Sequence, residues 1–451
     1  MSDTIPNTYS IEGTGPERVL RITGDLPEGF HGRQSDDAHL CPLDKQNAEA
    51  LRQALPWAKP QLVGDRKSFG YGDRLGIATP GHLLAARKSD MFPVLAQQSI
   101  REMERARRSP QEVMDDVTWA VVESGYQAGW GSDADHVKTP DEIDMCIDAG
   151  FIGFTLDPGQ YVNDEAESAD AASLRASLET FPWDILDSNP DAHQDYYTSG
   201  HGFSVEGYRR AAVKYGRAVA RVAELNAHIV DRFDGAGFDL EVSVDETDTA
   251  TTPQQHRYIA LELRRLGIAF IGLAPRFVGH FYKGVDYVGD LEAFDTDYAA
   301  HGSIAEELGP YKLSVHSGSD KLSIYPLVQK HTPRHVHVKT SGTSWLEALR
   351  IIARHDASLF RNILEMAKDG YDANRRSYHL DGTVENIPDV GDDDLPALLD
   401  DHDARQVVHV AFGPVLEAFY DPIYALLNSR MDDYWEGLRE HFEKHLKPFQ
   451  D

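Results

Sequence analysis

Residues 311–350 read YKLSVHSGSDKLSIYPLVQKHTPRHVHVKTSGTSWLEALR and contain the pattern that predicts the fold. Two short strand-like runs, 312–315 and 335–338, each end in a polar cluster that opens a helical pattern. Two successive strand–helix units with reactive side chains at the strand ends are typical of a (β/α)8 barrel, whose active face lies at that end. The alternative is a pair of ordinary strand–helix turns, in which Gly, Ser and Thr supply caps and tight turns.

The same alternation of strand and helix patterns extends along the chain on both sides of this stretch. We expect strands at 68–78, 127–137, 151–156, 238–244, 268–273, 312–315, 335–338 and 406–411. Helical patterns are expected at 97–108, 110–124, 204–227 and 253–266, with another helix beginning at Thr139-Pro140. Eight alternations in one chain favour a TIM-type (β/α)8 barrel over separate domains.

Two segments do not follow the alternation. Residues 1–66 hold clusters of Pro, Gly and Asp and one strand-like run at 18–22, and we interpret them as an N-terminal extension packed on the barrel. Residues 160–204 are acidic and poor in aliphatic side chains, which indicates an insertion of helices and loops over one face. The barrel domain is accordingly expected to span 67–451.

Composition narrows the class of function. The chain carries 74 acidic against 44 basic residues, a formal charge of −30, which argues against nucleic acid or an anionic membrane as a partner. No apolar run approaches the ~20 residues of a membrane span, and the first residues lack the pattern of a signal peptide. Two cysteines cannot build a disulfide framework. We expect a cytoplasmic protein, and a homo-oligomer is possible.

Histidines at the expected strand ends are candidate metal ligands. A catalytic divalent metal needs about three protein ligands and one open position. His136 and His316 end different strands, and His280, in the loop after the fifth strand, is the candidate third ligand. Capping or surface roles are the alternative for each of them. Zn, Mn, Fe, Co and Ni all accept imidazole, so the sequence does not distinguish among these metals.

Three carboxylates near these histidines are candidates for proton transfer. Asp135 precedes His136, and a carboxylate beside a metal suits a general base. It could instead cap the following turn. Glu241 and Glu246 follow or lie on the fourth strand and are candidate acid/base groups. Glu241 could instead belong to a buried structural ion pair, because an unpaired carboxylate inside a barrel is costly.

Basic and hydroxyl side chains at the same strand ends predict an anionic small-molecule substrate. Arg276, Lys321 and Lys339 stand out in so acidic a chain, and a carboxylate or phosphate would be their partner. Nucleotide-binding and serine-hydrolase motifs such as GxGxxG and GxSxG are absent from the sequence. The side chains expected to bind substrate are Lys138, Arg276, Ser317, Ser319, Asp320, Lys321 and Lys339.

Five stretches together resemble the tagaturonate epimerase family. They are SFGYGDRLGIATPGH (68–82), SDADHVKT (132–139), EVSVDET (241–247), HSGSDKLSIYP (316–326) and KTSGTSWLEALR (339–350). The resemblance implies a metal-dependent enzyme of hexuronate catabolism that interconverts D-tagaturonate and D-fructuronate, two acidic sugars. It also implies Asp135 as proton acceptor, His136, His280 and His316 as metal ligands, and a Glu of EVSVDET as proton donor. Spacing to His280 favours Glu241 over Glu246.

The implied reaction inverts a carbon that is β to the ketone, where simple enolisation cannot act. A base-assisted retro-aldol cleavage followed by re-addition could invert it, with a divalent metal stabilising the enolate as a Lewis acid. Two alternatives remain. A metal-dependent isomerase or aldolase acting on another acidic sugar would use nearly the same groups. A non-catalytic protein that binds sugar acids would keep the Lys and Arg residues but has little need for the histidines and paired acids.

Overall fold

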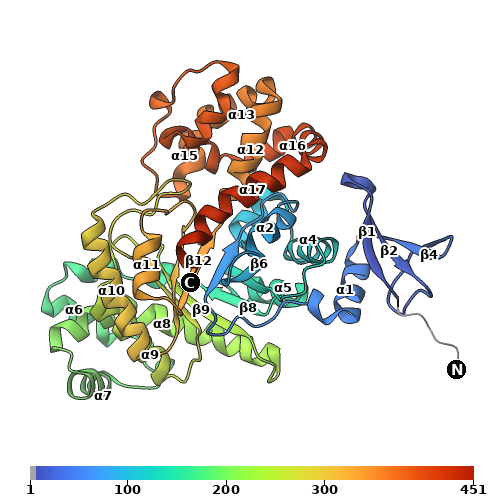
Figure 1. The fold of residues 1–451 in the computed structure, drawn as a ribbon. Helices are drawn as coiled ribbons and strands as arrows, with labels where there is room; N and C mark the ends of the chain where they lie inside the picture. Colours follow the sequence, from blue (N-terminus) through green and yellow to red (C-terminus); the bar gives the residue numbers. More distant parts are fainter. Residues whose placement is uncertain (1–6, 451) are drawn as a thin grey trace, which may run out of the picture.

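Eight parallel strands close into a barrel, which confirms the predicted fold class (Figure 1). The computed structural model describes residues 7–450. The first barrel strand in the sequence pairs with the last, and this pairing closes the sheet. The barrel strands are β5 (Ser68–Tyr71), β6 (Phe92–Ser99), β7 (Gly131–Val137), β8 (Gly153–Leu156), β9 (Asp239–Val244), β10 (Gly272–Pro275), β11 (Lys312–Val315) and β12 (Val336–Thr340).

Two predictions of secondary structure were wrong. Strand β6 was missed because Pro93 near its start and Gln97 and Gln98 near its end weaken the apolar pattern, and the glutamines merge with the helix that follows. The expected strand at 406–411 is part of a helix, α15 (His402–Val410). Its apolar run is short, and a short buried run does not distinguish a strand from a helix. The observed β6 therefore takes the place of the eighth strand.

Helices cover the outside of the barrel, and local signals set where several of them begin. Helices α4, α5 and α9 start with capping boxes at Ser109, Thr139 and Thr252, each followed by Pro at the first helical position. The helices between the barrel strands and after β12 are α2 (Thr79–Ala86), α3 (Ile100–Ala106), α4 (Pro110–Glu123), α5 (Pro140–Ala149), α8 (Val205–Phe233), α9 (Pro253–Arg265), α10 (Leu291–Glu307), α11 (Tyr325–His331) and α12 (Thr343–His355).

The N-terminal segment forms a separate antiparallel sheet beside the barrel, at the right of Figure 1. Leu20, Ile22 and Leu51 of this segment share a small apolar core with Trp119 and Val122 of α4, which fastens the sheet to the barrel. The boundary expected at residue 66 stays a prediction. The elements are β1 (Tyr9–Glu12), β2 (Val19–Thr23), β3 (Arg33–Ser35), β4 (Ala38–Pro42) and α1 (Lys45–Ala54).

Two further groups of helices extend the barrel. Helices α6 (Ala171–Glu179) and α7 (Pro190–Asp195) lie between β8 and α8, in the segment expected as an insertion. The second group gathers at the top of Figure 1 and consists of α13 (Ala357–Asp369), α15 and α16 (Phe412–Ser429). The short α14 (Tyr371–Asn374) joins α13 to the segment 375–379, which reaches the mouth of the barrel. The last long helix, α17 (Met431–Leu446), packs against α2 and α12.

Short helices of other types complete the structure. They are the 3-10 helices Gly15–Glu17, Pro56–Ala58, Gly159–Tyr161, Asp164–Glu167, Arg375–Ser377, Val384–Asn386, Asp392–Asp400 and Lys447–Phe449, and the π-helix Tyr196–Gly200. Both cysteines, Cys41 and Cys146, are buried and free. Between residues 7 and 450 no single helix is long and apolar enough to cross a membrane. Helices α15 and α16 meet the two conditions only as a pair, which is bent by 78° at the break between them.

Candidate active site

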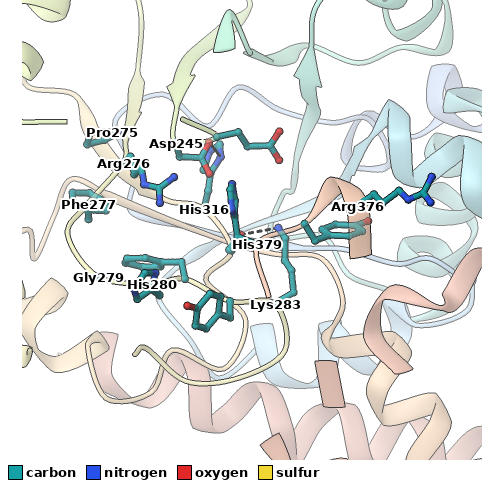
Figure 2. A pocket seen from close by; sticks show the side chains of 15 residues that line it. Asp245, Pro275, Arg276, Phe277, Gly279, His280, Lys283, His316, Arg376 and His379 are labelled. Atoms are coloured by element: carbon teal, nitrogen blue, oxygen red, sulfur yellow. Dashed lines mark hydrogen bonds and ion pairs between the residues drawn. The ribbon is translucent and has the colours of Figure 1, made fainter. Parts of the chain in front are cut away.

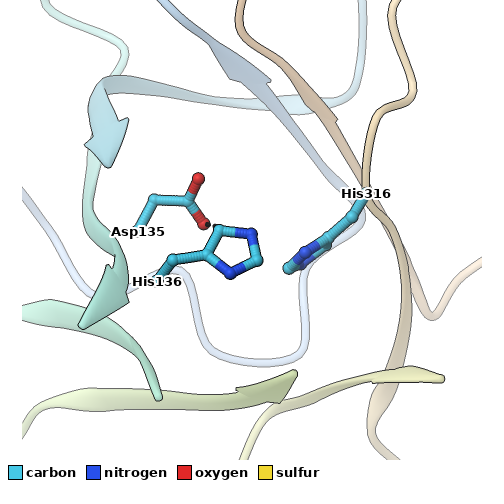
Figure 3. Close-up of side chains that lie close together, drawn as sticks. All are labelled: Asp135, His136 and His316. Carbon is cyan, nitrogen blue, oxygen red and sulfur yellow. Dashed lines mark ion pairs between the residues drawn. The ribbon is translucent and has the colours of Figure 1, made fainter. Parts of the chain in front are cut away.

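Strand β7 directs Asp135 and His136 to the same end of the barrel because its backbone is irregular there. The pairing of β7 with β8 shifts register between Ala134 and Val137, and His136 has a φ of 52°. A left-handed φ is uncommon outside Gly and clusters at functional sites. In a regular strand the two neighbours would point to opposite faces. The irregularity turns both side chains toward His316, as Figure 3 shows.

Asp135, His136 and His316 form a compact group of possible metal ligands (Figure 3). One ligand atom of each residue lies within 4.8 Å of the others, and the two imidazole centroids are 5.0 Å apart. His136 Nδ1 lies 3.1 Å from Asp157 Oδ2, a carboxylate that can fix the orientation of the ring. Two imidazoles and one carboxylate, largely shielded from water, fit a catalytic divalent metal that keeps an open position.

Lys339 lies inside the barrel and joins three carboxylates. Its Nζ is 2.6 Å from Asp133 Oδ2, 2.8 Å from Asp135 Oδ1 and 3.0 Å from Glu241 Oε1. All four side chains are buried. Burial opposes the charged amine, but the three carboxylates raise the pKa of Lys339 well above its usual value. The ammonium is therefore neutralised within the chain, and its predicted contact with substrate stays a prediction.

Glu241 connects this lysine to His316. Its Oε1 lies 2.6 Å from His316 Nε2, and His316 Nδ1 lies 3.1 Å from Asp245 Oδ1. Glu246 sits at the more exposed rim, where Arg101 pairs with it at 2.9 Å. The structure thus places Glu241 in the network of Asp135 and His316, while Glu246 lies beside His136.

The charges of this network set its protonation. Burial disfavours the imidazolium of His136, but Asp135, Glu246 and Asp157 raise its pKa to about 10. Burial also opposes the charged form of His316, whose pKa Asp245 raises to about 9. For Asp135 burial acts to raise the pKa, but Lys339 and the two imidazoles hold it below its usual value. A metal ion at these ligands would displace the imidazole protons, so its binding would be pH-dependent.

A cavity of about 400 Å³ opens beside the network, at the ends of β9 and β10 (Figure 2). His316 and Asp245 lie at one side of it, and Arg276 and His280 come from the loop after β10. His280 is exposed, and its ring stacks on Tyr282 at 5.0 Å between centroids. Within residues 7–450, His280 belongs to no group of ligand atoms within 4.8 Å. Its predicted metal role stays a prediction and would require this loop to move inward.

The other predicted substrate contacts divide between two places. Ser317 and Arg276 line the cavity, and Lys138 pairs with Asp157 at 2.9 Å beside His136. The three residues Ser319, Asp320 and Lys321 are buried outside the cavity lining. Lys321 Nζ donates to the carbonyls of Tyr282, at 2.8 Å, and of Val285. The role of these three in substrate binding stays a prediction.

Asp320 holds the loop after β11 to the C-terminal helices. Its Oδ2 pairs with Arg405 Nη2 at 2.8 Å, and its Oδ1 lies 2.6 Å from His441 Nε2. His441 Nδ1 is also 3.1 Å from Glu347 Oε1. Burial opposes the charged imidazole of His441, but Asp320 and Glu347 raise its pKa to about 9.

The free energy of unfolding should depend on pH through His441. A histidine whose pKa rises from its usual 6.5 to about 9 in the folded protein stabilises the fold fully below pH 6.5, and this stabilisation is lost as pH rises through 9. We expect the stability difference between wild type and His441→Gln to shrink by roughly 1–3 kcal/mol between pH 6.5 and 9.5. Urea midpoints of both proteins across this range measure it. A difference that stays constant with pH would contradict the assignment.

Several residues of the site were not predicted from the sequence. Asp133 carried a signal, because it lies two residues from Asp135 on one strand and therefore on the same face. Lys283 carried none, since it follows no strand end directly. The segment 375–379 contributes Arg376, Tyr378 and His379 to the cavity from nearly a hundred residues after β10, and no local pattern indicates this.

Comparison with known proteins gives the family. The model of the tagaturonate epimerase family (UxaE) matches residues 20–449. The chain belongs to the tagaturonate epimerase family. The tagaturonate/fructuronate epimerase of Thermotoga maritima is 38% identical over 442 residues, 95% of this chain and 91% of that protein.

Solved structures agree with the assignment to the tagaturonate epimerase family. The native crystal structure of fructuronate-tagaturonate epimerase UxaE from Cohnella laeviribosi is 33% identical, covers 99% of this chain and 94% of its own, and has a TM-score of 0.91. A complex of the same enzyme with one glycerol is 32% identical, covers 98% and 96%, and has a TM-score of 0.89. As a tagaturonate epimerase family member, the chain is an isomerase-class enzyme that acts on a carbohydrate derivative.

Proposed function

We propose that this enzyme interconverts D-tagaturonate and D-fructuronate. The observation that carries the proposal is the match over 95% of the chain to a relative named for this epimerisation. The site supports it, because proton-transfer groups and cations meet at one cavity of a size suited to a small sugar acid. A non-catalytic sugar-acid binder would not need Asp135, Glu241 and two histidines in one buried network.

His136 and His316 are proposed to hold a divalent metal cation, with Asp135 beside it as the proton acceptor. The fit rests on two imidazoles and a carboxylate whose ligand atoms lie within 4.8 Å of one another. Such a cation would supply Lewis acidity toward the substrate ketone and an adjacent hydroxyl. The donor set accepts Zn, Mn, Fe, Co or Ni. His280 could complete the ligand set only if the loop after β10 moved inward.

The residues around this group fit a retro-aldol route. Asp135 takes the proton of the hydroxyl on the carbon to be inverted. The bond from that carbon to the carbon next to the ketone breaks, leaving an aldehyde, and the electron pair becomes an enolate. The aldehyde rotates, the bond forms again on its other face, and the proton returns to the oxygen. Lys339, 2.8 Å from Asp135, keeps the carboxylate ionised and able to accept this proton.

Glu241 is proposed to assist the proton's return from the other side of the network. Its pKa lies well below the usual value, because Lys339 and His316 outweigh the effect of burial. Glu241 is therefore ionised at rest, and a proton it passes on must come from the His316 ring 2.6 Å away or from Lys339. Before Glu241 can act as the donor it must therefore take up a proton, and the His316 ring is the nearest imidazole that could supply it.

Proton NMR of D-tagaturonate with EDTA-treated enzyme tests the proposal. We expect D-fructuronate to form only after a divalent cation is restored, because the ketone then gains its electrophilic partner. The comparison needs circular dichroism before and after EDTA, so that loss of fold is not mistaken for loss of metal. No conversion with any metal by a folded protein would overturn the substrate assignment.

The same spectra separate the alternative reactions and test the route. Three-carbon fragments that accumulate would indicate an aldolase, and an aldose product would indicate an aldose–ketose isomerase. In heavy water the retro-aldol route leaves the hydrogen on the inverted carbon in place, since no C–H bond there is broken. Stoichiometric deuterium at that carbon would exclude the route.

A further inference from the structure

Lys283 is a half-buried cation at the mouth of the barrel without a carboxylate partner in the described part of the chain. Its Nζ donates to Ser317 Oγ at 2.7 Å, the dashed line in Figure 2. Among residues 7–450, no carboxylate oxygen lies within 4.0 Å of Lys283 Nζ, the longest distance at which an ion pair is counted. Glu246 acts on this ammonium group only from beyond that distance, and burial still lowers the pKa of Lys283, so the cost of withdrawing its charge from water is incompletely offset. An anion that enters the cavity would remove this cost.

Most other cations near the active site are neutralised by the chain itself. Lys339 pairs with three carboxylates, Lys138 with Asp157 and Arg101 with Glu246. In a protein of formal charge −30, a lysine left unpaired in a cavity is unusual and indicates a ligand of opposite charge.

Lys283 also lines two neighbouring cavities at the mouth of the barrel. It lines the 400 Å³ cavity and a smaller one that contains Asp135, His136 and Lys339. A six-carbon acid whose reacting carbon lies at Asp135 would extend from the small cavity into the large one. Lys283 stands where the two meet, together with His316.

Hydrogen bonds from two basic side chains fix the backbone on both sides of Lys283. Lys321 Nζ donates to the carbonyls of Tyr282, at 2.8 Å, and Val285, and Arg405 Nε donates to the carbonyl of Gly284. These contacts fix the residues directly before and after Lys283. A binding side chain on a loop gains precision from such support. Lys321 thus supports the backbone on both sides of Lys283, while its own predicted contact with substrate stays a prediction.

We propose that Lys283 binds the carboxylate of the substrate and thereby sets the preference of this enzyme for acidic over neutral sugars. The proposal rests on the proposed function, since it assigns a contact within a ketouronate complex. Arg276 lines the larger cavity and makes no ion pair in the described region, so it is the competing candidate for the same carboxylate.

Steady-state kinetics with D-tagaturonate test the contact. We expect Lys283→Met to raise KM roughly 30- to 100-fold, the scale of a lost charge-assisted contact, with kcat changed less than about fivefold. Lys283→Arg should recover most of the loss. Lys330→Met is the control and should match wild type, because it removes a surface lysine of α11 that pairs with Asp295 of α10. A KM that is unchanged in Lys283→Met would overturn the proposal. If Arg276→Met showed the expected rise in KM and Lys283→Met did not, Arg276 would be the residue that binds the carboxylate.

Binding of two unreactive ligands tests the same point without turnover. Isothermal titration calorimetry of D-galactonate and its neutral counterpart galactitol should show at least about tenfold tighter binding of the acid to wild type, and no such preference in Lys283→Met. A preference that persists in the variant, or is missing in wild type, would overturn the role of Lys283. Failure of wild type to convert D-tagaturonate, with this preference intact, would refute only the proposed function.

Discussion

Lys339→Met is expected to destabilise the protein by about 3–5 kcal/mol and to reduce turnover at least about 1,000-fold. The variant leaves Asp133, Asp135 and Glu241 buried without their shared cation, and breaking a buried ion pair from one side has this cost. The repulsion also raises the carboxylate pKa values, so that Asp135 loses the ionised form needed to accept a proton. Urea denaturation and the NMR assay of D-tagaturonate measure the two effects.

Two matched variants separate charge balance from general disruption. Lys138→Met removes a lysine whose side chain is 40% exposed and which pairs with one carboxylate, Asp157, among residues 7–450, so it should cost less than about 1 kcal/mol. The double variant Asp133→Asn/Lys339→Met removes one of the three buried carboxylate charges that the loss of Lys339 leaves unpaired. It should restore part of the stability but little activity. A Lys339→Met protein as stable and active as wild type would show that the three carboxylates are not held ionised by this lysine.

His316→Gln is expected to lose the proposed metal ion and to reduce turnover at least about 1,000-fold. Glutamine keeps a polar side chain of similar reach but does not supply an imidazole to the group formed with Asp135 and His136. It also removes the ring that links Glu241 to Asp245, so electrostatic stabilisation in the reaction is lost on the scale of a missing catalytic contact. Metal content after dialysis, by plasma mass spectrometry, and turnover by NMR check the prediction.

The control is His335→Gln. His335 lies before β12, at the end of the barrel away from the mouth, and pairs with Glu306 at 3.3 Å. This variant should keep both metal and activity. A His316→Gln protein that retains one metal per chain would place the ion elsewhere. The parallel variant His280→Gln then shows whether the loop after β10 supplies the ligand in solution.

Much of the fold was predictable from local patterns. The strands that surround His136, Glu241 and His316 were expected close to where they occur, because each is a short strand-like run that ends in polar residues ahead of a helical pattern. The exceptions were β6 and the run at 406–411. In both, the burial that decides between strand and helix comes from distant segments, and no single-sequence pattern carries it.

In the candidate site, too, the positions at strand ends could be predicted from the sequence, but the partners of the charged side chains could not. Asp135, His136 and His316 could be predicted as one group, because the ends of parallel strands in a barrel converge whatever the sequence between them. Lys321 and Lys339 looked alike in sequence as cations at strand ends. The structure gives them different partners, backbone carbonyls for Lys321 and three carboxylates for Lys339. Neither arrangement follows from residues near in sequence.

The sequence by itself determined the barrel fold, seven of its eight strands and the polar residues at its mouth, because strand periodicity, helix caps and strand-end chemistry are local properties. Only the tertiary structure decided which cation is left for a ligand. Lys283 is held in place through Lys321 and Arg405, and the wall facing it includes Tyr378. These contacts join segments about 40 to 120 residues apart, and whether a charge is paired depends on the packing of all of them at once.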